Sequence, residues 1–174
     1  MTLDLLQDDC RQCAALCCVA LAFDKSLQFA SDKDAGVPCQ NLTPDMRCGI
    51  HAKLAEAGYP GCVAFTCHGA GQRVVQDCFD GRDWRSDPAL LPRMMDSFQA
   101  MRKLHALILL LTEASRLPLS DSYQDIIDQH LARLSPDGPI TEDWLNDRDM
   151  PALEKEVHQF LRSLAPALQE GGRS

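Results

Sequence analysis

The residues in this sequence that are best able to do chemistry are cysteines, and they are confined to one end of it. All nine lie before Phe79, and the segment from Phe79 to Ser174 contains none. Clustered cysteines serve as a disulfide framework, as ligands of a metal or iron–sulfur centre, or as a thiol redox centre. The function of the protein therefore depends on which of these three roles the cysteine cluster has.

Eight of the cysteines form a short series of motifs, CRQCAALCC, GVPC, RC, PGC and FTC. They are Cys10, Cys13, Cys17, Cys18, Cys39, Cys48, Cys62 and Cys67, and we interpret all eight as metal ligands. Cys78 falls outside the series. A single buried cysteine is usually a small, inert apolar residue, which is our interpretation of Cys78.

The spacing of the cysteines bears on which metal they hold. Four-cysteine zinc sites usually contain paired CxxC motifs, and here only CRQC has that spacing. Several later cysteines stand beside glycine or proline, where backbone N–H groups can point at sulfur and stabilise thiolate charge. We therefore expect an iron–sulfur cluster of the [4Fe-4S] type, with zinc as the alternative.

Other features favour metal over disulfides or redox chemistry. The beginning of the chain, MTLDLLQDDC, has acidic residues where a secretory signal has lysine or arginine. The longest apolar run, residues 106–111, is too short to cross a bilayer. We therefore expect a cytoplasmic protein with no membrane partner, in which thiols stay reduced. CRQC would also suit a thioredoxin-like pair, but no βαβ pattern surrounds it.

Charge and composition argue against nucleic acid as a partner. The net charge is −8 and the pI is about 5.0. Only 6% of residues are aromatic, and no stripe of lysine and arginine with interleaved aromatic residues is present. The expected partners are therefore the metal centre and a protein.

The elements that position the cysteines are short. Turn signals AGVP, TPD, AGYPG and HGAG predict loops and short helices over residues 1–85. Within this part we expect one helix over residues 10–22 and another over residues 46–57 that ends at Gly58.

On the first of these helices, the cysteine side chains would point in two different directions. Cys10, Cys13 and Cys17 would lie within roughly 60° of one another around the helix axis, and Cys18 about 100° further round. Adjacent residues on a helix cannot easily bind one small tetrahedral ion. Cys17 and Cys18 should therefore have different partners.

The remaining residues, 86–174, predict a helical bundle of about three helices. Asp87 followed by Pro88 indicates the start of a helix that continues to about Arg116. Two more are expected over residues 121–134 and from Thr141 or Pro151 to Leu168. Apolar residues recur on the first helix at steps of three and four: Leu91, Met94, Met95, Phe98, Met101, Leu104, Ile108 and Leu111.

These elements predict an all-α fold. An irregular cysteine-rich metal-binding module, residues 1–85, should pack on the helical part, residues 86–174, to form a single domain over residues 1–174. We expect Val19, Leu21, Phe23 and Trp84 to cover one side of the first long helix. The other two helices should cover the opposite side.

The five histidines are not expected to be ligands. His51 and His68 stand near cysteines, and hydrogen bonding to the ligands is the expected role of each. His105 should lie in the core or at its boundary, and His130 and His158 should be exposed.

The cysteine series resembles a known family. CRQCAALCC, PC-x2-L, RC-x-IH and GC-x4-C are similar to the CxxCxxCC family of zinc- or iron-chelating bacterial domains. That family includes flagellin lysine N-methylases, which are associated with an iron–sulfur cluster. The resemblance implies that the eight cysteines are the metal ligands by position. The first motif here is CxxCxxxCC, one residue longer than in the family's name.

A closer resemblance covers residues 9 to about 115. DCRQCAALCCVALAF, FASDKDAGVPCQNL, RCGIHAKL, CHGAGQRV, GRDWR and MRKLHALILLLTEA are similar to the cysteine-rich N-terminal module of bacterial pentapeptide-repeat proteins. No pentapeptide repeats follow in this chain, so a role of the repeats cannot be carried over.

The sequence thus predicts a metal-binding protein that holds an iron–sulfur cluster through clustered cysteines and acts as a binding or scaffold module. One alternative is a structural zinc-binding protein. Another is an iron–sulfur enzyme or electron-transfer protein related to protein lysine N-methylases. No catalytic residue can be assigned, because no Ser/His/Asp arrangement, carboxylate pair or methyl-donor motif stands out.

Overall fold

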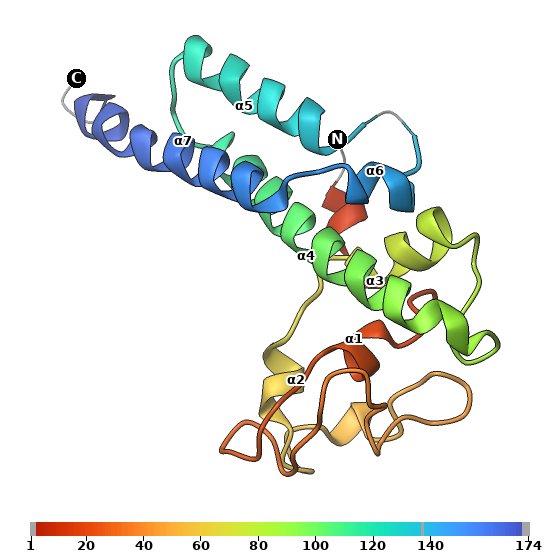
Figure 1. Cartoon of the computed structure of the whole chain (residues 1–174). Coiled ribbons are helices and arrows are strands. Elements are labelled where there is room, and N and C mark those ends of the chain that lie inside the picture. The colour runs from red at the N-terminus through yellow and green to blue at the C-terminus, as the bar shows by residue number, and fades with distance from the viewer. Residues whose placement is uncertain (1–2, 137, 172–174) are drawn as a thin grey trace.

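The computed structural model describes residues 3–136 and 138–171, and their regular secondary structure is helical (Figure 1). The α-helices are α1 (Leu16–Ala20), α2 (Pro60–Ala64), α3 (Ala70–Arg73), α4 (Leu91–Ala114), α5 (Asp121–Leu134), α6 (Glu142–Asn146) and α7 (Met150–Gly171). Short 3-10 helices cover Leu3–Leu6, His51–Lys53 and Pro88–Leu90, and one π-helical turn covers Val74–Cys78. The predicted all-α fold is confirmed.

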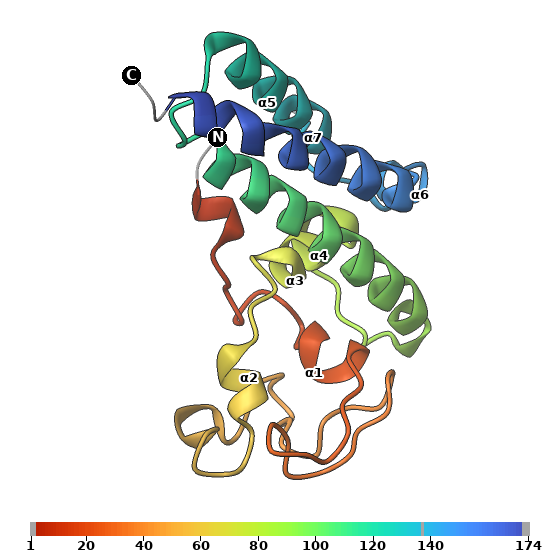
Figure 2. The same cartoon turned by 90° about the vertical axis from the view of Figure 1, so that its left-hand side faces the viewer.

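Helix α4 runs through the middle of the molecule and organises the rest (Figures 1 and 2). Its start follows the predicted signals, since the Asp87 side chain accepts a hydrogen bond from the Ala89 amide and Pro88 opens the 3-10 turn before it. Helices α5 and α7 pack on α4 from one side, and α1 and α3 contact it as well. Other helices therefore pack against more than one face of α4.

The helices after α4 differ in detail from the prediction. The expected third helix is two helices, because α6 is capped by Thr141, whose Oγ1 accepts from the Trp144 amide at 3.2 Å, and α7 begins separately at Met150. On α5, Ile127 is buried, whereas the neighbouring Ile126 is 38% exposed. The histidine of α5, His130, was also expected to be exposed, but it is buried against the Phe160 ring of α7.

The predicted helix over residues 10–22 is wrong in its first half. Ala14 and Ala15 have φ angles of 47° and 53°, so the chain turns sharply there and α1 begins only at Leu16. The indole N–H of Trp84 donates to the Ala14 carbonyl at 2.8 Å. Tertiary contacts of this kind override the high helix propensity of alanine.

The predicted helix over residues 46–57 is also mostly absent. Only the 3-10 helix His51–Lys53 forms there, and Met46 takes a left-handed conformation with φ 61°. Gly58 has φ +85°, as a residue that ends a helical turn commonly does. The cysteine-rich part therefore consists of turns more than of helices.

A single buried apolar cluster includes residues from both parts of the chain. From the first part it contains Leu16, Val19, Ala20, Ala70, Val74, Val75, Phe79 and Trp84, and from α4 it contains Met94, Phe98, Met101, Leu104, Leu107, Ile108, Leu111 and Ala114. Leu21 packs against the cluster as expected. Phe23 instead stacks on Phe29 within the loops, with ring centroids 4.3 Å apart.

This shared cluster gives a test of the single-domain prediction. Asp80, Gly81 and Arg82 are exposed, so a protease should cleave there. The two pieces should stay associated, and a shortened chain beginning at Asp87 should aggregate because it exposes the apolar side of α4 that α1 and α3 cover. Size-exclusion chromatography after cleavage shows whether the two pieces stay associated. A soluble, cooperatively melting fragment from Asp87 onward would show two independent domains.

Within the residues that the structure describes, no helix is both long enough and apolar enough to cross a lipid bilayer.

Candidate metal centre

The eight cysteines of the motif series lie in and around the lobe formed by residues 10–67, drawn in red to yellow below α4 in Figure 1. Cys10 and Cys62 are exposed, Cys13 is buried, and the other five are partly buried. Turns, the short helix α1 and the segment before α3 position them.

Cys10 and Cys13 form a tight turn. The Cys13 thiol donates to the Cys10 carbonyl at 3.6 Å. A hydrogen bond from the Cys13 thiol lowers the pKa of Cys10 to about 6. After the left-handed turn at Ala14 and Ala15, the Leu16 amide donates to the Cys13 carbonyl at 3.2 Å, and the amides of Ala15 and Leu16 partly oppose the rise in the pKa of Cys13. Amides near a sulfur stabilise a thiolate ligand in this way.

Cys17 and Cys18 follow on α1 with their sulfur atoms 3.9 Å apart. The hydrogen bond between them raises the pKa of Cys17 and lowers the pKa of Cys18. Burial opposes ionisation of both thiols. Negative charge on Cys18, Cys13 and Cys67 also raises the pKa of Cys17.

Backbone contacts join Cys18 to two later cysteines. The Cys39 amide donates to the Cys18 carbonyl at 2.9 Å. Leu42, whose amide donates to the Cys39 carbonyl at 2.9 Å, forms an isolated antiparallel bridge with Cys48. The Ile50 amide points at the Cys48 sulfur. Burial raises the pKa of Cys48, and the charges of Cys18 and Cys39 contribute to the rise.

Cys62 lies on α2 and belongs to the same neighbourhood. Burial raises the pKa of its thiol to about 11. The charges of Cys18, Cys39 and Cys48 contribute to this rise, in that order.

Cys67 stands immediately before α3 and is held by Asp8. The Asp8 carboxylate accepts from the Gly69 amide at 2.7 Å and from the Cys67 amide and thiol at 3.3 and 3.2 Å. Burial opposes ionisation of Asp8, but these donors outweigh it and lower its pKa. Burial raises the pKa of Cys67 to about 11, and the Gly71 amide opposes this rise. Asp8 was not identified from the sequence.

A buried lysine supplies positive charge beside the cysteines. Lys33 is only 8% exposed, and its ammonium donates to the carbonyls of Val19, Asp34 and Val37 at 3.2, 3.0 and 2.9 Å. Burial lowers the pKa of Lys33, and the neighbouring thiolates of Cys39, Cys18 and Cys17 oppose that change. No periodicity or motif in the sequence marks Lys33 for this position.

The cysteines are gathered but do not form a finished ion-binding geometry. Among the described residues, no three His, Cys, Asp or Glu side chains converge closely enough to hold one metal ion as they stand. The thiols instead hydrogen bond locally, as Cys67 does to Asp8 and Cys13 to the Cys10 carbonyl. Binding by these cysteines would require their side chains to turn toward a common point.

Cys78 lies apart from the eight. It belongs to the π-helical turn, and its thiol donates to the Ile140 carbonyl at 3.1 Å. Burial raises its pKa to about 12, and the contributing charges are those of Asp77 and Glu142 against Arg73. None of these is a cysteine.

The histidines differ in burial and in their distance from the cysteines. His105 is 2% exposed and its Nδ1 lies 2.5 Å from the His68 carbonyl, which confirms the expected core position. His158 is exposed, as predicted. His51 lies near Cys10, where its positive charge would lower the pKa of that thiol after the stronger effect of the Cys13 hydrogen bond.

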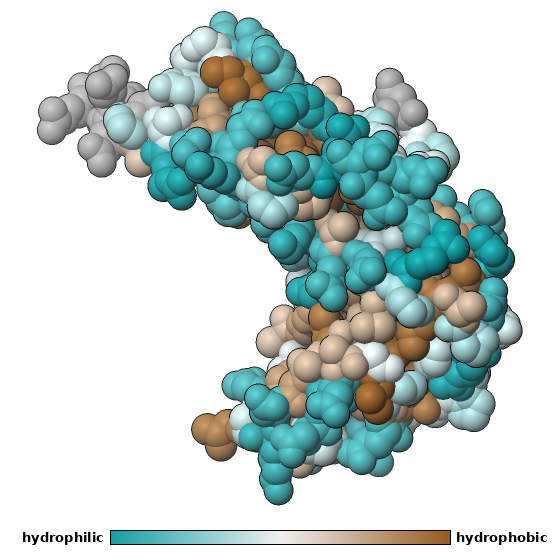
Figure 3. Space-filling view, in the orientation of Figure 1, coloured by the Kyte–Doolittle hydropathy of each residue, from teal (hydrophilic) through white to brown (hydrophobic). Residues whose placement is uncertain are grey.

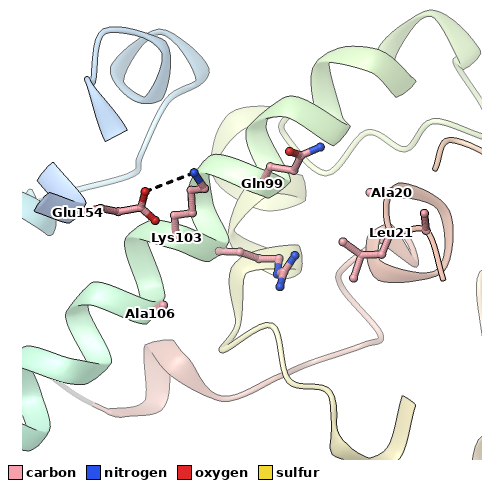
Figure 4. Close-up of a pocket in the computed structure, with 8 residues that line it drawn as sticks. Ala20, Leu21, Gln99, Lys103, Ala106 and Glu154 are labelled. Carbon is pink, nitrogen blue, oxygen red and sulfur yellow. Dashed lines mark hydrogen bonds and ion pairs between the residues drawn. The ribbon is translucent and has the colours of Figure 1, made fainter. Parts of the chain in front are cut away.

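A groove opens beside the cysteine-rich lobe, on the side where the space-filling view is hollowed (Figure 3). Its volume is about 450 Å³, and its lining residues are Ala20, Leu21, Ala22, Gln99, Arg102, Lys103, Ala106 and Glu154. Lys103 and Glu154 form an ion pair there at 3.4 Å (Figure 4). The groove therefore runs between the segment after α1 and the middle of α4.

Comparison with known proteins gives a relative in Bacillus subtilis (strain 168), described as "Uncharacterized protein YybG". It is 45% identical over 115 residues, which cover 66% of this chain and 41% of the relative. The chain thus spans about two-fifths of that relative's length. No protein-family model matches the chain, and no solved structure matches it.

Proposed function

We propose that this protein binds metal through its eight clustered cysteines as an iron–sulfur protein, and that the centre organises a binding or scaffold module. The observation that carries the proposal is the gathering of the eight thiols from three separate stretches of chain, with backbone amides aimed at sulfur. Backbone amides oppose the rise in pKa of three of these thiols, those of Ala15 at Cys13, Ile50 at Cys48 and Gly71 at Cys67. Hydrogen bonds from backbone amides stabilise the negative charge of a ligating thiolate, whereas a neutral thiol has no such charge to stabilise.

The donor set fits a thiolate-bound centre. Four cysteines suffice for an iron–sulfur cluster or a structural zinc ion, and eight are present. The Lys33 ammonium lies within electrostatic reach of Cys17, Cys18 and Cys39 and would offset part of their negative charge. When bound, the centre would supply cross-links among loops that have few large buried apolar residues of their own, and its ligation free energy would become folding free energy.

The test is a spectrum together with elemental analysis. Protein produced with sufficient iron and purified without oxygen should be brown and should show broad absorption near 400 nm, as expected of thiolate-bound iron–sulfur clusters. Iron and acid-labile sulfide should be present in equal amounts. A colourless protein with stoichiometric zinc would decide for the zinc alternative. A protein with neither metal would refute the proposed function.

A further inference from the structure

We propose that the groove between the segment after α1 and the middle of α4 binds an extended, acidic peptide of a partner protein. The peptide would add as a strand beside Leu21 and Ala22 and would pair a carboxylate with Arg102. The groove volume of about 450 Å³ lies within the range of about 300–1,000 Å³ that ligand pockets occupy. No cysteine lines this groove, so its ligand and the proposed metal centre can be tested separately.

One face of α4 forms the floor of the groove. Gln99 is followed three, four and seven residues later by Arg102, Lys103 and Ala106, a spacing that puts side chains on one face of a helix. These residues do not belong to the buried apolar cluster, which takes its members from the other faces of α4. Figure 4 shows Gln99 and Lys103 on α4, with Leu21 beyond one side of them. This face of α4 is therefore accessible to a ligand.

Arg102 supplies a positive charge that no carboxylate neutralises within the described part of the chain. Its guanidinium lies 5.1 Å from the ring centroid of Phe65 and 5.7 Å from that of Phe98, which are cation–π distances. None of the ion pairs among the described residues includes Arg102, whereas the neighbouring Lys103 pairs with Glu154. The two rings thus position the guanidinium without pairing its charge. A planar guanidinium binds a carboxylate through two parallel hydrogen bonds.

The opposite wall of the groove is a short stretch of extended backbone. Leu21 has φ −91° and ψ 135°, and the chain continues through Ala22 into an antiparallel bridge between Phe23 and Lys33. The Phe23 amide donates to the Lys33 carbonyl at 3.0 Å, and the Phe23 carbonyl accepts from the Lys33 amide at 2.8 Å. The amide and carbonyl of Ala22 therefore point to the other side of the segment.

The backbone groups of Ala22 are available to a further strand. Neither its amide nor its carbonyl forms a hydrogen bond with any residue that the structure describes, and Ala22 is exposed. Unpaired backbone groups on an extended segment are the place where a peptide adds as a strand. A small carboxylic acid would use Arg102 alone, whereas a peptide would use Arg102 and this edge together. The two features therefore favour a peptide.

The lining of the groove also indicates which peptide would fit. Alternate residues of an added strand point to the same side, so two side chains that are two positions apart would both face α4. One of them should be acidic, to pair with Arg102, and the other small and apolar, to contact Leu21 and Ala106. The net charge of −8 disfavours acidic ligands over most of the protein surface. Binding should therefore be confined to this groove.

The test is a nuclear magnetic resonance titration of the full-length protein with a synthetic peptide that repeats threonine, glutamate, threonine and valine. The peptide should shift the amide signals of Leu21, Ala22 and the α4 residues around Arg102. The same peptide with glutamine in place of glutamate should bind at least about tenfold more weakly, because it lacks the charge that pairs with the guanidinium. This comparison uses the wild-type protein and is independent of how any variant folds.

Variants then test each part of the site. Arg102→Gln should weaken binding of the glutamate peptide at least about tenfold. Arg116→Gln is the matched control, because Arg116 is 53% exposed just after α4 and pairs with Glu113, and it should leave binding unchanged. Ala22→Pro removes one backbone donor and should weaken peptide binding by about two- to tenfold. Leu21 already has the extended backbone that a residue before proline favours, so this variant should fold.

Three results would overturn the proposal. The first is a glutamate peptide that fails to bind, binds no better than the glutamine peptide, or shifts amides remote from the groove. The second is binding of succinate that depends on Arg102 without any binding of the peptide, which would identify a pocket for a small acid. The third is a dimer, detected by sedimentation, that Arg102→Gln dissociates, since a second copy of the chain would then occupy the groove.

Discussion

Removing the metal of the proposed centre should unfold the loops from residue 22 to residue 67 while α4 keeps its protection. These loops have little apolar core, and Leu27, Val37 and Val63 are 95%, 51% and 60% exposed. Structural zinc contributes apparent binding free energies of about 10–16 kcal/mol in small cysteine-rich domains, far above what the loops' own packing supplies. The loss should therefore be complete rather than partial.

Amide hydrogen exchange before and after treatment with a chelator under reducing conditions measures this directly. Exchange should accelerate over residues 22–67, whereas the amides of α4 between Phe98 and Leu111 should stay slow because they lie in the shared apolar cluster. The Cys78→Ser protein should respond in the same way as the wild type. Unchanged protection of the loops after verified loss of metal would show that the centre does not hold the fold.

Phe98→Ala should lower the free energy of unfolding by about 3–5 kcal/mol, the usual cost of removing a fully buried phenylalanine side chain. Phe98 is completely buried on α4. Its ring lies 3.7 Å from where a Cβ would stand on Gly71, and the Arg102 guanidinium lies 5.7 Å from the ring centroid. The cavity would thus open at the junction between α4 and the residues that position Cys13 and Cys67.

Urea unfolding monitored by circular dichroism measures this change in the free energy of unfolding. Leu110→Ala is the matched control on the same helix, because Leu110 is 41% exposed and its truncation should cost less than about 1 kcal/mol. Phe98→Ala should also reduce the metal content of the proposed centre, since Phe98 and Cys13 both pack at Gly71. A cost as small as that of Leu110→Ala would mean that α4 and the cysteine-rich part are not packed on each other as described.

The elements that could be predicted are those specified by neighbouring residues. The spacing of apolar residues and the Asp87–Pro88 start were enough for α4, and the same signals were enough for α5. Such signals work because helix capping and a single apolar face involve residues only three or four positions apart. Trp84 was correctly expected to pack against α4, because it belongs to the apolar cluster that includes the buried side of that helix.

The elements that could not be predicted depend on residues distant in the sequence. The segment CRQCAAL favours a helix by propensity, but the Trp84 indole N–H donates to the Ala14 carbonyl, and a left-handed turn forms at Ala14 and Ala15 instead. Asp8 and Lys33 hold their positions through contacts with the Cys67 segment and with loop carbonyls. Nothing in their local sequence distinguishes them from exposed charged residues.

The sequence by itself determined the fold class, the helices of the second part and the set of cysteines available for ligation. Only the tertiary structure decided which cysteines are neighbours. Cys13 and Cys67 meet at Gly71, and Cys18 and Cys39 meet through one backbone hydrogen bond, although each pair is separated by many residues. The physical reason is that the cysteine-rich loops lack a regular period. The direction of each thiol is therefore set by long-range packing and hydrogen bonds, which one-dimensional spacing does not encode.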